Sequence, residues 1–495
     1  MLAADAAGAS GREPFGEKWE RDYLGHYLTA GPSRFHEDLY ADLADLHARR
    51  GTRLNYRGPR GSAKTTHISK AYPLWCVCEQ AEPFILLLAE TGEQARLYLK
   101  AIKDELATNP KLAARYPAAC GEGPTWRNDA IETRNGVCIV ARGSGGRVLG
   151  LTHRNRRPTL VVGDDLNQRA DAYSPTLRRR KLDWFEKDVL KVGEPGTNYL
   201  TAGTSIHRQA IVCELSRNPA WSTRRYAAVL RWPDRLDLWA ECERRLSNLA
   251  DPDRLATARA FYEANRADMD AGAELLWPDR FPLFDLMAER AADGPAAFAS
   301  ERQDEPGADG ATEFPAEYFD WPGLWFEDWP ADVVCKAQTL DPSKGAASKP
   351  GDYQAHARGA VGRDGTIYVE CDMRREPVTD MVGRAIDWAA SWGVGELAVE
   401  ENGTMGLIGP EFARQLAERR KMVNLVAFTS TDPKLARIRR AGGYLSRRQI
   451  RVRNTPGGRL LVDQWRDVPA GEFDDGPDAV GSLIARLERM VNGGR

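Results

Sequence analysis

The stretch RGPRGSAKTT, residues 57–66, has nearly the spacing of a phosphate-binding loop. Gly58 is followed after four residues by a small residue and then by Lys64 and Thr65, as in the pattern G-x-x-x-x-G-K-[ST]. The small residue is Ala63, where the pattern has glycine. Alanine adds only a methyl group, so we expect a small cost if its φ angle stays negative. A simple turn is the alternative for this stretch taken alone.

A loop of this kind wraps backbone N–H groups around phosphate at the start of a helix. Its lysine contacts the β- and γ-phosphates, and the hydroxyl that follows the lysine contacts Mg²⁺. The sequence therefore predicts an ATP site formed by the following residues: Gly58, Arg60, Gly61, Ser62, Ala63, Lys64, Thr65 and Thr66.

The stretch PTLVVGDD, residues 158–165, is typical of a buried strand that ends in two carboxylates. An aspartate after such a strand holds Mg²⁺ in phosphate-transferring enzymes, so we expect Asp164 to bind the ion. Asp165 stands where many ATPases use glutamate to orient the attacking water, and its side chain is shorter. A solvated loop acid is the alternative for either residue.

Two further features complete the predicted ATP site. In the last part of the predicted strand 197–205, Thr201 or Thr204 is a candidate to sense the γ-phosphate, with a turn as the alternative. On a Gly-rich stretch, Arg142 or Arg147 is a candidate to stabilise the transferred phosphate. Contact with DNA and a solvated side chain are the alternatives for these arginines.

A second group of acids lies in the C-terminal third of the chain. Asp341 and Glu400 each end a predicted apolar strand, and FDDGPDAV opens the last predicted helix. Three or four such carboxylates can hold two Mg²⁺ or Mn²⁺ ions for phosphodiester cleavage. Asp475 and Asp478 are the preferred ligands in the last motif, and Asp474 is the runner-up. Taken alone, each acid has a structural alternative: a turn for Asp341, a solvated side chain for Glu400, and a helix N-terminus for the acids at 474–478.

The order of predicted elements indicates two α/β domains. Buried strands alternate with helices after the loop, which implies a parallel sheet. The second half reads as a strand, a hairpin turning at Asp364 and Gly365, a helix, a strand, a helix, a strand and a final helix, which is the order of an RNase H-like nuclease. We also expect a helix within residues 17–50 and a helical stretch over about 210–290.

These readings give four predicted parts. They are an N-terminal extension at 1–35, a P-loop ATPase core at 36–210, a helical lid or linker at 211–330 and an RNase H-like nuclease domain at 331–495.

The composition limits the setting in which the protein works. The net charge is −2, so any nucleic-acid surface must be local, and 177–181 and 437–453 are the candidate basic stretches. The eight cysteines lack the spacing of a metal site or disulfide framework, which favours a reducing compartment. The start does not resemble a signal peptide and the apolar runs are too short for a bilayer, so we expect no membrane association.

Together these motifs resemble those of the large terminase subunits of tailed bacteriophages and prophages, over about residues 35–490. RGPRGSAKTT resembles the Walker A motif of that family, RPTLVVGDDL its Walker B region and TAGTSIH its coupling motif. The segment 276–306 resembles the one that joins the two domains. TLDPSKG, GDYQA, VEENG and FDDGPDAV resemble the nuclease motifs. The resemblance implies an additional-strand P-loop ATPase followed by an RNase H-like nuclease.

The resemblance also implies a function and partners. The family uses ATP to move double-stranded phage DNA into the capsid, cuts concatemeric DNA as an endonuclease, and docks as a ring on the portal protein. It works in the host cytoplasm with a small terminase subunit, and with ATP and Mg²⁺ (or Mn²⁺ in the nuclease site) as cofactors. The residues that match family positions are Lys64, Thr65, Asp164, Asp341, Glu400, Asp475 and Asp478, and Asp165 stands where the catalytic glutamate of the family usually lies. Ala63 and Asp165 depart from the family pattern, which concerns the rate of ATP hydrolysis more than nucleotide binding.

Two other functions fit parts of the sequence. A DNA clamp or capsid-docking scaffold with a decayed P-loop would account for Ala63 and Asp165. A helicase-like ATPase without nuclease activity would leave the acids at 341, 400 and 474–478 unexplained. DNA-stimulated ATP hydrolysis argues against the clamp, and metal-dependent nicking of a plasmid argues against the helicase.

Overall fold

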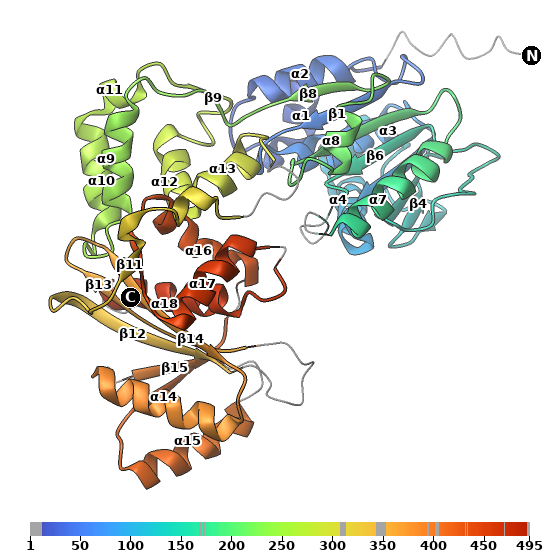
Figure 1. Cartoon of the computed structure of the whole chain (residues 1–495). Helices are drawn as coiled ribbons and strands as arrows, with labels where there is room; N and C mark the ends of the chain where they lie inside the picture. The colour runs from blue at the N-terminus through green and yellow to red at the C-terminus, as the bar shows by residue number, and fades with distance from the viewer. Residues whose placement is uncertain are drawn as a thin grey trace, which may run out of the picture. The chain divides into compact units, whose positions relative to one another are not determined.

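The computed structural model describes residues 12–167, 171, 174–306, 313–342, 353–393, 396–400, 405–430, 432, 434–469 and 471–492. The chain divides into two compact units, each with its own sheet (Figure 1). Unit 1 consists of Met1–Trp232, Ala273–Pro282 and Ala299–Asp309, and unit 2 of Pro233–Gly272, Leu283–Phe298 and Gly310–Arg495. The region 211–330 thus supplies residues to both units.

Unit 1 contains an eight-stranded sheet in the order β3-β4-β5-β2-β6-β7-β1-β8. The strands are β1 (Arg53–Arg57), β2 (Phe84–Ala89), β3 (Thr125–Trp126), β4 (Ala130–Glu132), β5 (Cys138–Gly143), β6 (Leu160–Asp164), β7 (Asn198–Gly203) and β8 (Ser222–Arg225). From β5 to β8 every pair is parallel. One strand, β7, separates β1 from β6, which confirms the predicted α/β fold with the additional strand between the loop and the acidic strand.

Helices cover both faces of this sheet. Along β2 the buried side chains alternate between two hydrophobic cores, as expected for a strand enclosed on both sides. The first core is formed with α1 (Glu17–Leu24), α2 (Arg34–Leu43), η2 (Thr65–Ala71), α3 (Tyr72–Cys78), α4 (Gly92–Thr108) and α5 (Pro110–Arg115). The second is formed with α7 (Pro175–Lys187), η3 (Val189–Lys191) and α8 (Ile211–Leu215).

Two predictions for unit 1 were incomplete. The helical pattern within 17–50 is split, because the chain leaves helical geometry between η1 (Gly25–Tyr27) and α2, where Gly31 and Pro32 are poor helix formers. The stretch predicted to be helical over 210–290 also contains β8, β9 (Val229–Arg231) and β10 (Glu274–Leu275). β8 pairs with β1, so tertiary pairing decides its conformation.

Unit 2 contains a seven-stranded sheet in the order β11-β17-β14-β13-β12-β15-β16. The strands are β11 (Trp325–Phe326), β12 (Val333–Asp341), β13 (Gln354–Gly362), β14 (Ile367–Arg374), β15 (Glu396–Glu400), β16 (Asn424–Phe428) and β17 (Ile450–Arg453). β12, β13 and β14 form an antiparallel meander, and β15 and β16 extend it with parallel pairs. This arrangement confirms the predicted RNase H-like fold.

The sheet of unit 2 also has helices on both faces. One core forms with α14 (Val378–Trp392) and α15 (Met405–Arg419), and the other with α16 (Lys434–Ser446), α17 (Pro456–Asp467) and α18 (Asp475–Val491). The rest of the unit includes α9 (Leu236–Leu246), α10 (Arg254–Ala264), α11 (Arg266–Asp270) and α12 (Leu283–Asp293), and α13 (Pro295–Arg302) crosses the unit boundary. α9 and α10 pack side by side (Figure 1).

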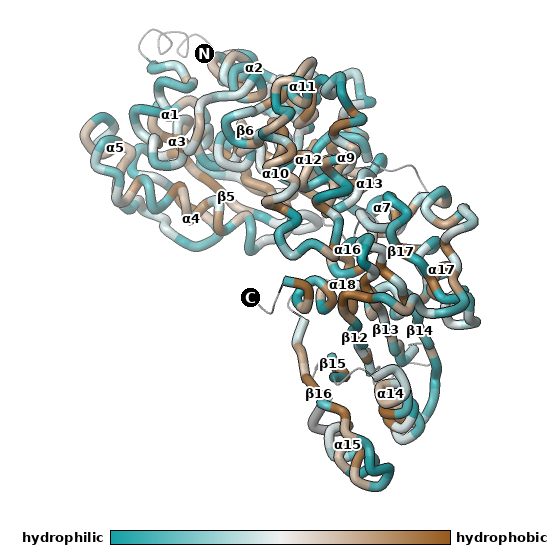
Figure 2. The backbone as a smooth tube through the Cα atoms, turned by 90° about the vertical axis from the view of Figure 1, so that its left-hand side faces the viewer, coloured by the Kyte–Doolittle hydropathy of each residue, from teal (hydrophilic) through white to brown (hydrophobic). Residues whose placement is uncertain are grey.

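Hydropathy follows this layering along the backbone. Figure 2 shows brown, hydrophobic backbone along strand β5, whose Ile139 and Val140 are buried. Among the helices that the structure describes, none has the length and apolar character that crossing a bilayer takes.

Candidate functional site

The loop that follows β1 folds around its own lysine. Lys64 is buried, and its ammonium donates hydrogen bonds to the backbone carbonyls of Gly58 at 2.9 Å and Pro59 at 2.7 Å. Burial lowers the pKa of Lys64 below its usual value. A positive charge at the start of a helical segment is an arrangement that binds phosphate. The other loop residues surround it, with Arg60 and Gly61 exposed, Ser62 buried, and Thr65 and Thr66 half-buried.

Ala63 adopts the backbone conformation that the loop pattern reserves for glycine. Its φ angle is +60°, in the left-handed region. The condition for a small cost, a negative φ, is therefore not met at this position. The methyl group of a left-handed residue crowds the backbone and costs about 1–2 kcal/mol, so the chain carries local strain in this loop.

Asp164 lies at the end of β6, on the same sheet edge as the loop. It is fully buried, and its Oδ2 accepts a hydrogen bond from the hydroxyl of Ser69 at 2.9 Å. Burial, followed by repulsion from Asp165, raises the pKa of Asp164 to about 6, while the hydroxyls of Thr65 and Ser69 oppose this shift. Its Oδ1 is buried without a partner in the described part of the chain. An unpaired carboxylate oxygen close to a threonine hydroxyl suits a magnesium ion.

Asp165 connects the ends of two neighbouring strands. Its Oδ1 accepts a hydrogen bond from the backbone N–H of Thr204 at 2.9 Å, just beyond β7. The Thr204 hydroxyl lies 3.4 Å from the Lys64 ammonium. Thr204 thus stands between the loop and Asp165. Thr201 lies apart from this group, because its hydroxyl bonds to Asn55 Oδ1 at 2.9 Å inside the sheet.

The two candidate arginines occupy different settings. Arg142, in β5, pairs with Asp129 at 3.0 Å. Arg147 lies on the Gly-rich loop that follows and is exposed. Of the two, Arg147 has the more accessible guanidinium.

A cavity of about 260 Å³ opens at the ends of β2, β6 and β7. Arg60, Asp165 and Thr204 line it, together with Glu90. Sequence reasoning missed Glu90 as a site residue, although it directly follows the buried apolar strand β2. A carboxylate at the end of a buried strand was the available signal.

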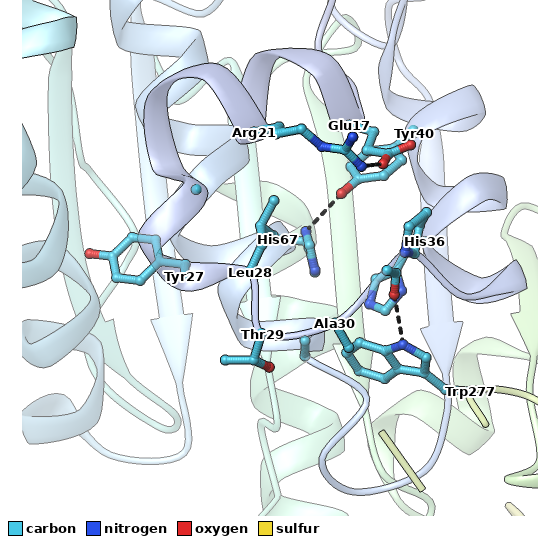
Figure 3. Close-up of a pocket in the computed structure, with 14 residues that line it drawn as sticks. Glu17, Arg21, Tyr27, Leu28, Thr29, Ala30, His36, Tyr40, His67 and Trp277 are labelled. Carbon is cyan, nitrogen blue, oxygen red and sulfur yellow. Dashed lines mark hydrogen bonds and ion pairs between the residues drawn. The ribbon is translucent and has the colours of Figure 1, made fainter. Parts of the chain in front are cut away.

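A second cavity, of about 370 Å³, lies on the other side of the loop (Figure 3). Ala63, His67 and Trp277 line it, along with residues of the segment between α1 and α2. The indole N–H of Trp277 donates to the carbonyl of Gly31 at 2.7 Å, which ties this segment to the cavity wall. No sequence motif pointed to these cavity residues.

His36 links this segment to the phosphate-binding loop. The backbone N–H of Ser33 donates to its Nδ1 at 2.9 Å, so Nδ1 carries no proton. Its Nε2 lies 3.2 Å from the carbonyl of Ser62 and donates to it. Burial, reinforced by His67, lowers the pKa of His36 to about 3. A neutral imidazole therefore anchors the loop.

The acids of unit 2 converge at one end of its sheet. Asp341 ends β12 and Glu400 ends β15, and these strands pair in parallel. The start of α18 lies against β12, where the hydroxyl of Thr339 donates to the carbonyl of Ala479 at 3.2 Å. Burial raises the pKa of Asp341 to about 7, with further repulsion from Glu400, Asp478 and Asp475.

Two cations from α16 reach into this group of acids. Arg437 donates to both carboxylate oxygens of Asp478, at 2.6 and 2.5 Å, and lies 3.8 Å from Glu400. The Lys434 ammonium lies 2.6 Å from Asp474 and 3.7 Å from Asp475. Within the described ranges, no three His, Cys, Asp or Glu side chains are arranged to hold a metal ion as they stand. The motif segments at 343–352 and 401–403 lie outside the described residues.

No protein-family model and no curated protein matches the sequence. Solved structures that match nearly the whole chain are phage large terminases. The HK97 large terminase is 13% identical, with 94% of this chain and 98% of that chain covered and a TM-score of 0.36. The large terminase of a thermophilic bacteriophage, in complex with ADP, is 11% identical, with 97% of this chain and 99% of that chain covered and a TM-score of 0.41.

The nuclease of the large terminase from the thermophilic phage G20c, with bound magnesium, matches part of the chain. It is 13% identical, with 32% of this chain and 85% of that chain covered and a TM-score of 0.22. With identities this low and TM-scores below 0.5, the function has to be argued from the residues of this chain itself.

Replacing Ala63 by glycine should relieve the strain in the loop. The gain from a relaxed left-handed residue exceeds the entropy that glycine adds to the unfolded chain, so we expect a rise in stability of up to about 1 kcal/mol. Urea unfolding followed by tryptophan fluorescence measures it. The matched control Ala113→Gly, at an exposed position in α5, should lower stability by about 1 kcal/mol. Equal losses in both variants would contradict the left-handed conformation of Ala63.

His36 predicts a pH dependence of stability. Its pKa in the folded protein is about 3 and its usual value is 6.5, so its contribution is complete above pH 6.5 and is lost as the pH falls from 6.5 towards 3. In His36→Gln this loss is absent. When the pH is lowered from about 7.5 to about 4.5, the unfolding free energy of wild type should fall relative to that of His36→Gln by about 1–3 kcal/mol. Calorimetry checks this, and a constant difference would rule out a buried neutral imidazole.

Proposed function

We propose that this protein is a phage terminase large subunit: an ATPase that drives double-stranded DNA into a capsid and cuts it with a metal-dependent nuclease. The observation that carries the proposal is that one chain has two sheets, each with carboxylates gathered at the ends of its strands. One group of carboxylates faces a lysine-containing loop in a sheet with the additional-strand order, and the other lies in an RNase H-like sheet. A helicase-like ATPase without nuclease activity accounts for the first group alone.

The nucleotide would occupy the loop of unit 1. Lys64 and the backbone N–H groups of residues 60–66 would bind the phosphates, and the cavity beside Ala63 would receive the base. Thr65 and the unpaired Oδ1 of Asp164 hold Mg²⁺. The bound ion offsets negative charge on the phosphates. Thr204, between Lys64 and Asp165, links the phosphate end of the site to β7.

The nuclease site would use Asp341, Glu400 and Asp475, with Asp478 as a further ligand. The donors are all carboxylate oxygens, which suit Mg²⁺ or Mn²⁺, and their mutual repulsion at Asp341 is what a divalent cation relieves. Ions held by these carboxylates would supply an activated water and stabilise the leaving oxygen. Asp478 becomes a ligand only after it releases Arg437.

DNA would bind through its backbone, because a motor must not read sequence. Within 437–453, the structure pairs Arg437, Arg439 and Arg440 with acids. Arg448 and Arg451 instead stack near the ring of Trp321, and we propose them as phosphate contacts.

The partners follow from the proposed role. They are double-stranded DNA, the portal protein and a small terminase subunit, with ring assembly on the capsid in the host cytoplasm.

Paired variants test the two activities separately. Asp341→Asn should lower plasmid cleavage with Mn²⁺ by at least about 100-fold, because a ligand that stabilises charge by several kcal/mol is lost. It should leave ATP hydrolysis unchanged. Lys64→Ala should abolish ATP hydrolysis and still cut the plasmid. Asp463→Asn, at an exposed position in α17, serves as the control for both assays.

The same assays define failure. If the wild-type protein cuts DNA with neither Mn²⁺ nor Mg²⁺, the nuclease assignment falls and an ATPase or clamp remains. If cleavage persists in Asp341→Asn, the acids of unit 2 are structural.

A further inference from the structure

The carboxylate that follows the magnesium-binding aspartate is already engaged. Asp165 accepts the N–H of Thr204 at 2.9 Å with one of its oxygens, and its own backbone has a φ of +43°, in the left-handed region. This geometry holds a short side chain against the end of β7. A residue that must orient a water beside the γ-phosphate needs a carboxylate that reaches into the cavity.

Glu90 supplies such a carboxylate from the neighbouring strand. β2 pairs with β6 in parallel, and Ala89 lies opposite Asp164. Glu90 and Asp165 are therefore the next residues on the two strands, one position beyond the last pair. Because the carboxyl ends of parallel strands share one edge, both side chains face the region where the phosphates would lie.

The environment of the Glu90 carboxylate suits a functional role. It lines the 260 Å³ cavity with Arg60, Asp165 and Thr204, so it shares a space with the loop and with the residue that contacts Lys64. It is half-buried, and it makes no hydrogen bond or ion pair with the residues that the structure describes. Partial burial raises its pKa above the usual value, which strengthens it as a proton acceptor.

We propose that Glu90, and not Asp165, is the catalytic residue that orients the attacking water in ATP hydrolysis. This inference rests on the proposed ATPase function. The water oxygen forms a bond to the γ-phosphorus, and the bond from that phosphorus to the β–γ bridging oxygen breaks. Glu90 accepts the proton of the water and returns it to the phosphate released with ADP. Asp165 is a positioning residue that holds Thr204 beside Lys64.

The test compares isosteric variants of the full-length protein. Glu90→Gln should lower kcat for ATP hydrolysis by at least about 100-fold, the size of effect that loss of a positioned base produces. Its affinity for a fluorescent ATP analogue should stay within about threefold of wild type, since the carboxylate acts on water and not on binding. Asp165→Asn keeps an oxygen that accepts the Thr204 N–H, so its kcat should fall by less than about tenfold.

The controls separate this inference from the function on which it rests. Glu93→Gln, at an exposed position in the first turn of α4, should behave as wild type. If wild type hydrolyses ATP and Glu90→Gln keeps its kcat, or loses nucleotide binding in parallel with kcat, the role of Glu90 is overturned and the ATPase stands. If wild type hydrolyses no more ATP than Lys64→Ala, the proposed ATPase itself fails, and the role of Glu90 with it.

Discussion

Parallel pairing of the central strands of unit 1 determines where its charged groups meet. Since β2, β6, β7 and β1 run in one direction, their carboxyl ends collect Asp164, Asp165, Thr204 and the lysine loop at a single edge. The charges also make each other's burial possible. Desolvation lowers the pKa of Lys64, and attraction to Asp165 and Asp164 opposes that shift. Burial at this depth disfavours a charged ammonium, and the nearby carboxylates offset part of that cost.

In unit 2, parallel strand ends also bring charged groups together, but the counter-charge comes from a different element. The parallel pair of β12 and β15 brings Asp341 beside Glu400, and α18 adds its first-turn acids from the layer above. Burial first, and then repulsion from Glu400, Asp478 and Asp475, raises the pKa of Asp341 at the strand end. The balance comes from α16, whose Arg437 and Lys434 contact the acids from the side.

Much of this arrangement could be predicted from the sequence, because it depends on local patterns. Apolar runs fixed the strands, and Asp164, Asp341 and Glu400 end them as expected. Properties that arise from tertiary contacts could not be predicted from the sequence. The left-handed φ of Ala63 follows from the closed loop, and the role of His36 follows from a carbonyl 26 residues away. β17 was read only as part of a basic stretch, because its two inward residues, Ile450 and Val452, are too few to show a strand period.

The contacts of Arg437 and Lys434 bear on how the chain matures after synthesis. An acidic pocket that lacked cations would fold only when ions were at hand, and a new chain would be exposed to proteases until then. In this protein the counter-charge is part of the polypeptide and arrives with α16. Unit 2 can therefore reach its folded state with the counter-charge that α16 supplies, whether or not a metal ion is at hand.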